Sequence, residues 1–189
     1  PALDPFALPL LPLTGEGAPA TTRVMTLAAL EEYQDTALVV IPRPDATVLF
    51  GLAEDDLLDD TPDSLFIPGN LDSALSYLET ELAMRAEGTC SHGRRLLLVA
   101  DCEQEADRIS RLLKRHAGDV SAVVLGDWPG DRVSVDQDGR VDAPSDMAGA
   151  LPCRLPAMSR TEARDRLFAI VTTEAPKKRR RGSRPSKRP

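Results

Sequence analysis

Residues 96–125 read LLLVADCEQEADRISRLLKRHAGDVSAVVL, two apolar runs of strand length separated by a helical segment. The first run, 96–100, ends at Asp101, and the second run covers 120–125. Between them, apolar residues recur at helical spacing: Ala106, Ile109, Leu112 and Leu113. Runs without polar alternation are typical of strands that are buried on both faces. We therefore predict an α/β fold of three layers, with a mainly parallel sheet covered by helices on both faces.

The preceding segments continue this alternation of strands and helices. Residues 37–41 (ALVVI) predict a short buried strand, and residues 71–87 predict the clearest helix of the chain. Asn70 or Asp72 is placed to cap that helix. Its apolar positions share one face: Leu71, Ala74, Leu75, Leu78 and Leu82. Residues 46–52 (ATVLFGL) fit a strand or a helix start, and SLFI at 64–67 predicts a short strand.

The C-terminal part adds a hairpin and a last helix. Residues 132–141 contain Asp138-Gly139 between two short apolar segments, which predicts a small β-hairpin. Ser159 and Glu162 fit a capping box that opens a helix running through Ile170. We divide the chain into a Pro-rich lead-in with a candidate first strand (1–13), an α/β domain (14–174) and a disordered basic tail or linker (175–189).

The N-terminal part is harder to interpret. Residues 1–12 contain several prolines, including Pro9 and Pro12, and proline cannot donate a hydrogen bond within a sheet. This argues against a central strand there. Residues 14–23 (TGEGAPATTR) are interpreted as a Gly-containing turn, and Val24 to Leu30 as a helix.

The overall composition narrows the class of protein. The chain has 189 residues, of which 42% are hydrophobic, and no apolar stretch approaches the roughly 20 residues that cross a membrane. Three cysteines, Cys90, Cys102 and Cys153, are too few and too widely spaced for a disulfide framework. We therefore expect no membrane segment in this chain, and we expect the protein to be cytoplasmic.

The charge is unevenly distributed. The net charge is −7, from 23 basic and 30 acidic residues. The tail holds eight of the basic ones: Lys177, Lys178, Arg179, Arg180, Arg181, Arg184, Lys187 and Arg188. The rest of the chain therefore has 15 basic against 30 acidic residues, or −15. Such a body repels nucleic acid, whereas the tail attracts it.

The turn at Gly15-Glu16-Gly17 lies where a phosphate-binding loop would lie, between an apolar stretch and a helix. A working loop needs a Lys for the terminal phosphate, and no Lys occurs in residues 1–113. Thr21, Thr22 and Arg23 could hold an anion at a helix N-terminus, but a plain turn into a helix is favoured. We therefore expect no cofactor and no nucleotide hydrolysis.

The strand at 96–101 has the shape of a Walker B strand, an apolar run that ends in a carboxylate able to hold magnesium. The structural alternative is that Asp101 caps the next helix, with Gln104 at the third position, and this is favoured. The Glu that catalyses hydrolysis in such motors is replaced by Cys102, and Glu103 lies one step further on.

Other candidate sites have stronger structural explanations. Cys90-Ser91-His92 lacks a second pair at zinc spacing, so we expect no metal site. His116 is interpreted as a response to a helix dipole and Trp128 as a core or edge residue. An acidic run could bind calcium but lacks the spacing of a calcium loop, so a solvated face is favoured: Glu54, Asp55, Asp56, Asp59, Asp60 and Asp63.

The order of these motifs resembles the motor domain of FtsK-type DNA translocases. It resembles more closely the degenerate P-loop-like module of large actinobacterial proteins that combine LysM and bacterial transcriptional activator domains. The resemblance is carried by TGEGA (14–18), NLDSAL (70–75), VVLGDWP (123–129) and VDQDGRV (135–141). It covers residues 8–174 and includes no catalytic motif.

This resemblance implies a role that composition alone does not. It implies a non-catalytic, motor-like module that mediates interaction or regulation in a larger actinobacterial regulatory protein, with transcriptional regulation as its setting. The expected partner is a protein or a neighbouring domain of the same chain. The alternative is a nucleic-acid-associated protein that binds weakly, without sequence preference, through its basic tail. A third hypothesis is a nucleotide-binding enzyme with an unorthodox loop.

Overall fold

The computed structural model describes residues 3–57, 61–89 and 93–180 of the chain. Seven strands form one sheet in the order β3-β2-β4-β5-β1-β6-β7. All neighbouring strands are parallel except β6 and β7. The strands are β1 (Leu10–Thr14), β2 (Ala37–Val40), β3 (Leu65–Phe66), β4 (Arg95–Asp101), β5 (Val120–Leu125), β6 (Val133–Val135) and β7 (Val141–Asp142).

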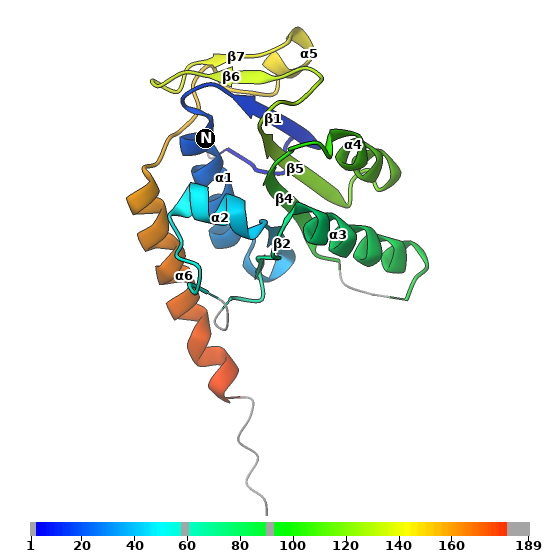
Figure 1. Cartoon of the computed structure of the whole chain (residues 1–189), viewed down its shortest axis with the longest axis vertical. Helices are drawn as coiled ribbons and strands as arrows, with labels where there is room; N and C mark the ends of the chain where they lie inside the picture. Colours follow the sequence, from blue (N-terminus) through cyan, green and yellow to red (C-terminus); the bar gives the residue numbers. More distant parts are fainter. Residues whose placement is uncertain (1–2, 58–60, 90–92, 181–189) are drawn as a thin grey trace, which may run out of the picture.

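Helices cover both faces of this sheet, as predicted (Figure 1). The helices are α1 (Ala18–Glu32), α2 (Arg43–Phe50), α3 (Leu71–Ala86), α4 (Ala106–Arg115), α5 (Ser145–Ala148) and α6 (Arg160–Arg180). Helices α1, α2 and α6 pack on one face, and α3 and α4 pack on the other. The predicted three-layer α/β fold is confirmed.

The apolar runs explain why both faces are buried. Leu97 and Val99 of β4 point to the α1 side, whereas Leu96 and Leu98 point to the α3 side. Successive side chains of a strand alternate between faces, so a run without polar residues supplies two cores. All four side chains are at most 1% exposed. The predicted apolar face of α3 is buried as well, and Asn70 caps this helix by accepting a 2.8 Å hydrogen bond from the Ser73 backbone N–H.

The N-terminal segment departs from the expectation. Strand β1 is central, with β5 on one side and β6 on the other, although it contains Pro12. The paired residues of β5 reach Pro12, and those of β6 start at Leu13. The pairing with β5 thus ends at the proline, and the pairing with β6 begins after it. At this position the missing N–H disturbs the hydrogen bonding of the sheet least. The argument from proline against a central strand was wrong.

The helix after β1 also differs from the prediction. Helix α1 starts at Ala18, directly after Gly17, so Thr21 to Arg23 lie in the helix and not in a turn. Pro19 is compatible with this start, because the first turn of a helix needs no N–H from that position. The ambiguous residues 46–50 belong to α2, which ends at Gly51 in a left-handed conformation with φ of 64°.

The C-terminal part contains the predicted hairpin and a helix longer than predicted. Strands β6 and β7 pair antiparallel around Asp138-Gly139, and the Ser159 hydroxyl accepts a hydrogen bond from the Glu162 backbone N–H. Helix α6 continues to Arg180, through residues 175–180 that we assigned to a disordered tail. Residues 181–189 lie outside the described part, so the disordered tail stays a prediction there. Among the described residues, no helix combines the length and the apolar character that a membrane span requires.

Candidate functional site

The loop after β1 lies at the carboxyl end of the sheet, where parallel sheets bind ligands. Here that loop is filled by the chain itself. Gly15 has φ of 92°, and a Cβ on it would lie 2.4 Å from the Val135 carbonyl oxygen. A Cβ on Gly17 would lie 2.1 Å from the Asp136 carbonyl oxygen. The two glycines are therefore explained by the close approach of the loop to β6.

The backbone donors of this loop are also in use. The Gly17 N–H donates a 3.0 Å hydrogen bond to the Val135 carbonyl, and the Ala18 N–H donates to the Gly15 carbonyl. Pro19 has no N–H. A phosphate-binding loop needs several free N–H groups that point at one anion. Residues 17–19 of this loop therefore have no free N–H group for a phosphate.

The three polar residues weighed as an alternative anion site make hydrogen bonds within the protein. The Thr21 hydroxyl donates to the Pro156 carbonyl at 3.0 Å, and the Thr22 hydroxyl donates to the Ala18 carbonyl at 2.8 Å. Both threonines are fully buried. They cannot reach an anion outside the helix, so the anion-site alternative is wrong for them.

Arg23 links three segments that are distant in the sequence. Its Nε donates a 2.6 Å hydrogen bond to the Leu49 carbonyl at the end of α2, and its guanidinium donates at 3.1 Å to the Met158 carbonyl before α6. Burial, and next the positive charge of Arg160, lower the pKa of Arg23 below its ordinary value. The Arg23 side chain, which we call the Arg23 clamp, thus connects α1 with the end of α2 and with the segment before α6.

Asp101 ends β4 as the sequence predicts, but it does not cap the next helix. Helix α4 begins at Ala106 with Glu105 at its N-cap position, too far along the chain for Asp101 to reach. The Asp101 carboxylate instead accepts a 2.9 Å hydrogen bond from the Glu103 backbone N–H. Gly126 is required beside it, because a Cβ there would lie 2.3 Å from an Asp101 carboxylate oxygen. The capping interpretation was wrong.

The sequence did not single out the carboxylate that faces Asp101. Asp45, in the first turn of α2, has its pKa raised to about 6. Burial is the main cause, and the negative charges of Asp101 and Glu103 add to it, while a hydrogen bond with the Asp101 backbone acts in the opposite direction. The residue after β4, Cys102, is fully buried, and its thiol pKa is raised by burial and then by Asp101.

The remaining candidates from the sequence are Trp128, His116 and residues 90–92. Trp128 is a buried core residue, as expected, and His116 follows the last residue of α4. Cys90, Ser91 and His92 lie outside the described residues. Among the described ones, no group of three or more His, Cys, Asp or Glu side chains could hold a metal ion.

The acidic run is only partly a solvated face. Glu54 and Asp55 are exposed, but Asp56 accepts hydrogen bonds from the Ala53 backbone N–H at 2.7 Å and from Arg164 at 3.3 Å. The Arg43 guanidinium donates to the Asp56 carbonyl at 2.7 Å. Asp56 therefore fastens the loop after α2 to α6. Asp59 and Asp60 lie outside the described residues.

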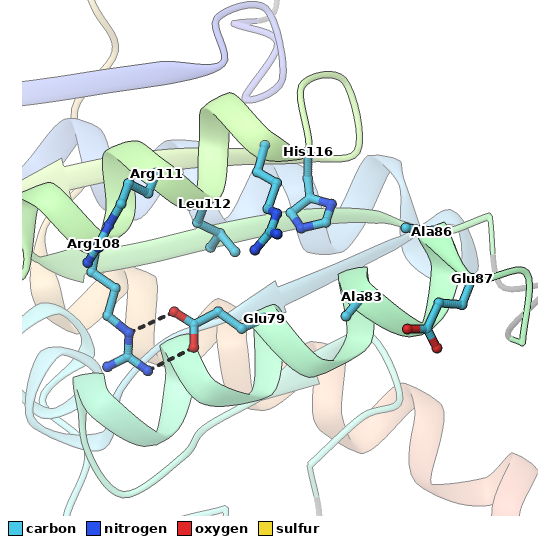
Figure 2. Close-up of a pocket in the computed structure, with 9 residues that line it drawn as sticks. Glu79, Ala83, Ala86, Glu87, Arg108, Arg111, Leu112 and His116 are labelled. Atoms are coloured by element: carbon cyan, nitrogen blue, oxygen red, sulfur yellow. Dashed lines mark hydrogen bonds and ion pairs between the residues drawn. The ribbon is translucent and has the colours of Figure 1, made fainter.

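A groove of about 580 Å³ lies between α3 and α4 (Figure 2). Arg108 of α4 and Glu79 of α3 point toward one another at one end, with hydrogen bonds of 2.7 and 3.0 Å. The other lining residues are Ala83, Ala86, Glu87, Arg111, Leu112, Arg115 and His116. Sequence reasoning missed this site, although three arginines at helical spacing on α4 were a signal for it.

Only the first part of the basic segment 177–188 belongs to the described residues. Lys177, Lys178, Arg179 and Arg180 follow the backbone of α6, whose C-terminal end extends past the rest of the domain in Figure 1. Arg181, Arg184, Lys187 and Arg188 lie outside the described residues.

Comparison with known proteins assigns no family to this arrangement. The chain matches no protein-family model. No curated protein matches it either.

Proposed function

We propose that this chain is a non-catalytic, motor-like module that mediates interaction or regulation in a larger actinobacterial regulatory protein. One observation carries the non-catalytic part of the proposal. The loop in the position of a phosphate-binding loop is occupied by its own chain, with the Gly17 N–H bonded to Val135 and with Arg23 bonded to Leu49 and Met158.

The chemistry needed for ATP hydrolysis supports the same conclusion. Catalysis of phosphoryl transfer depends on cations and N–H donors that neutralise the phosphate charge. Near this loop the exposed side chain is Glu16, which repels phosphate, and no Lys occurs before Lys114. Asp101 has Asp45 as its neighbour, and the negative charges of Asp101 and Glu103, which help to raise the pKa of Asp45, also disfavour an additional anion there.

The regulatory setting has a different basis. It rests on the resemblance of TGEGA (14–18), VVLGDWP (123–129) and VDQDGRV (135–141) to the degenerate module of actinobacterial regulators. This basis is an association between motifs and a known context, and it names no partner.

Nucleotide binding tests the proposal directly. ATP is titrated into the protein by calorimetry with magnesium present, and phosphate release is followed separately. We expect no heat of binding at micromolar protein and no release above the buffer rate. Micromolar affinity for ATP, or phosphate release that Asp101→Ala abolishes, would sink the proposal in favour of a nucleotide-binding enzyme.

A second function, binding of nucleic acid through the tail, is favoured by one feature of α6. The C-terminal end of α6, which includes residues 177–180, extends past the rest of the domain in Figure 1, so this end of the helix lies away from the acidic body. Intact protein and a chain that ends at Pro176 are titrated with random duplex DNA at low and at physiological salt. Weak binding by the intact chain alone, lost at physiological salt, supports this function, and equal binding by both chains excludes it.

A further inference from the structure

We propose that the groove between α3 and α4 binds a short acidic segment of a partner protein. Carboxylates of that segment pair with Arg111 and Arg115, and an apolar side chain of it contacts Leu112, Ala83 and Ala86. The inference rests on the proposed function, because it specifies the partner of an interaction module.

The groove exists because of the residues that face each other across it. Glu79, Ala83 and Ala86 follow one face of α3, while Arg108, Leu112 and Arg115 follow one face of α4. The alanines are too small to fill the space between the helices, and Leu112 is buried beneath it. A volume of about 580 Å³ is that of a site for a few side chains.

At one end of the groove a single guanidinium, that of Arg108, pairs with two carboxylates of α3 and lies 3.9 Å from Glu105 of the same segment. Arg108 holds Glu79 through two hydrogen bonds and also donates to Asp72 at 2.7 Å and to Ser76 at 3.1 Å. These hydrogen bonds lower the pKa of Glu79 and raise that of Arg108. Arg108 is thus a structural part of the groove and is not available to a partner.

The remaining arginines are available. Within the described part of the chain, the side chains of Arg111 and Arg115 have no hydrogen-bond or ion-pair partner, and both are exposed. Two lining carboxylates oppose them: Glu79, whose pKa the charge of Arg111 helps to lower, and Glu87 at the far end of the groove. Among the residues that line the groove, three arginines face two glutamates, so the lining carries a net charge of +1 beside the apolar carbon of Leu112 and the alanines.

The size and surroundings of the groove favour a peptide over nucleic acid. A duplex would extend beyond the groove over a body that carries −15 outside residues 177–188, and that body repels a long polyanion. A short segment carries fewer charges than a duplex and is repelled less by that body. Nucleic acid also offers no aliphatic side chain for the apolar floor, whereas a leucine between glutamates does.

Binding of a synthetic probe tests the proposal. The probe is a fluorescein-labelled peptide in which glutamates flank a pair of leucines, and its control has glutamine at every glutamate. We expect anisotropy to rise with the glutamate peptide and not with the glutamine peptide. The double substitution Arg111→Gln and Arg115→Gln weakens binding about tenfold, since each exposed charge pair contributes modestly.

Lys114→Gln is the matched control, because Lys114 is an exposed cation on the same helix that does not line the groove. It changes the affinity less than about twofold. An equal loss in Lys114→Gln, equal binding of both peptides, or displacement of the peptide by random duplex DNA at equal charge would overturn the proposal. So would failure of the glutamate peptide to shift the Ala83 and Ala86 amide resonances. These outcomes are independent of ATP binding, which tests the non-catalytic proposal alone.

Discussion

The Arg23 guanidinium donates a 2.6 Å hydrogen bond to the backbone carbonyl of Leu49, the second-to-last residue of α2. The carbonyls in the last turn of a helix lack partners within the helix and need a donor from elsewhere. Arg23 supplies that donor and joins α1 to α2. Arg23, in the second turn of the helix that follows the Gly15–Gly17 loop, thus contributes to the stability of the domain.

We expect Arg23→Met to destabilise the protein by about 2–3 kcal/mol. Methionine retains the apolar stem, but the Leu49 and Met158 carbonyls lose their donor where water has limited access. Denaturant unfolding followed by circular dichroism measures the loss. Arg132→Met is the control, because the Arg132–Asp127 ion pair at 3.0 Å is exposed and contributes less than about 1 kcal/mol. Equal effects of the two substitutions would contradict the clamp.

The glycines of the loop give a second prediction. Gly17→Ala places a methyl group 2.1 Å from the Asp136 carbonyl oxygen, and backbone on both sides must move to admit it. We expect a loss of about 2–3 kcal/mol in the free energy of unfolding. Gly69→Ala meets no atom within 4 Å and is expected to change stability by less than about 0.5 kcal/mol. A tolerated Gly17→Ala would show that the loop is not packed against β6.

The third prediction concerns the core between α3 and the sheet. Leu78 is fully buried among residues that include Leu96 and Leu98 of β4, so Leu78→Ala should cost about 2–5 kcal/mol. Met84 lies on the same helix with 39% of its surface exposed, and Met84→Ala should cost less than about 1 kcal/mol. Thermal and denaturant unfolding of the two variants checks the contrast.

The parts of the fold that could be predicted depend on the spacing of apolar residues within short segments. The runs at 96–100 and 120–125 are apolar throughout, so their burial follows from composition wherever they lie. The face of α3 from Leu71 to Leu82 is likewise set by spacing. Strand β1 was not predictable from Pro12, because the change of neighbour from β5 to β6 is a property of the whole sheet.

The site depends on long-range contacts that one sequence does not show. Arg23 could be recognised as a basic residue near a helix start, but its partners Leu49 and Met158 lie 26 and 135 positions away. Asp45 gave no signal, because the charges that act on it belong to Asp101 and Glu103 on another strand end. The sequence shows that residues 1–113 contain no Lys, and the structure shows that the Gly17 N–H is bonded to Val135.

The last prediction follows from two neighbouring carboxylates, Asp45 in the first turn of α2 and Asp101 at the end of β4. The pKa of Asp45 in the folded protein is about 6, above the value of about 3.9 expected in the unfolded chain. Between these values the folded state binds more protons, so the stability of the protein falls as pH rises from about 4 to 6. Above pH 6 the full cost of ionising Asp45 in the folded state lowers the stability, and below pH 4 this cost is absent.

Asp45→Asn removes this penalty, because asparagine stays neutral and can still accept a hydrogen bond from the Asp101 backbone. We expect the variant to be more stable than the natural protein by about 1 kcal/mol at pH 7.5, a value reduced for solvent screening, and equally stable at pH 4. Carboxyl carbon NMR provides the direct measurement, with a midpoint for Asp45 near 6. Asp101→Asn should lower that midpoint by removing a facing negative charge. A midpoint near 4 in the natural protein, or a stabilisation by Asp45→Asn that persists at pH 4, would show that burial and Asp101 do not act on this carboxyl as described.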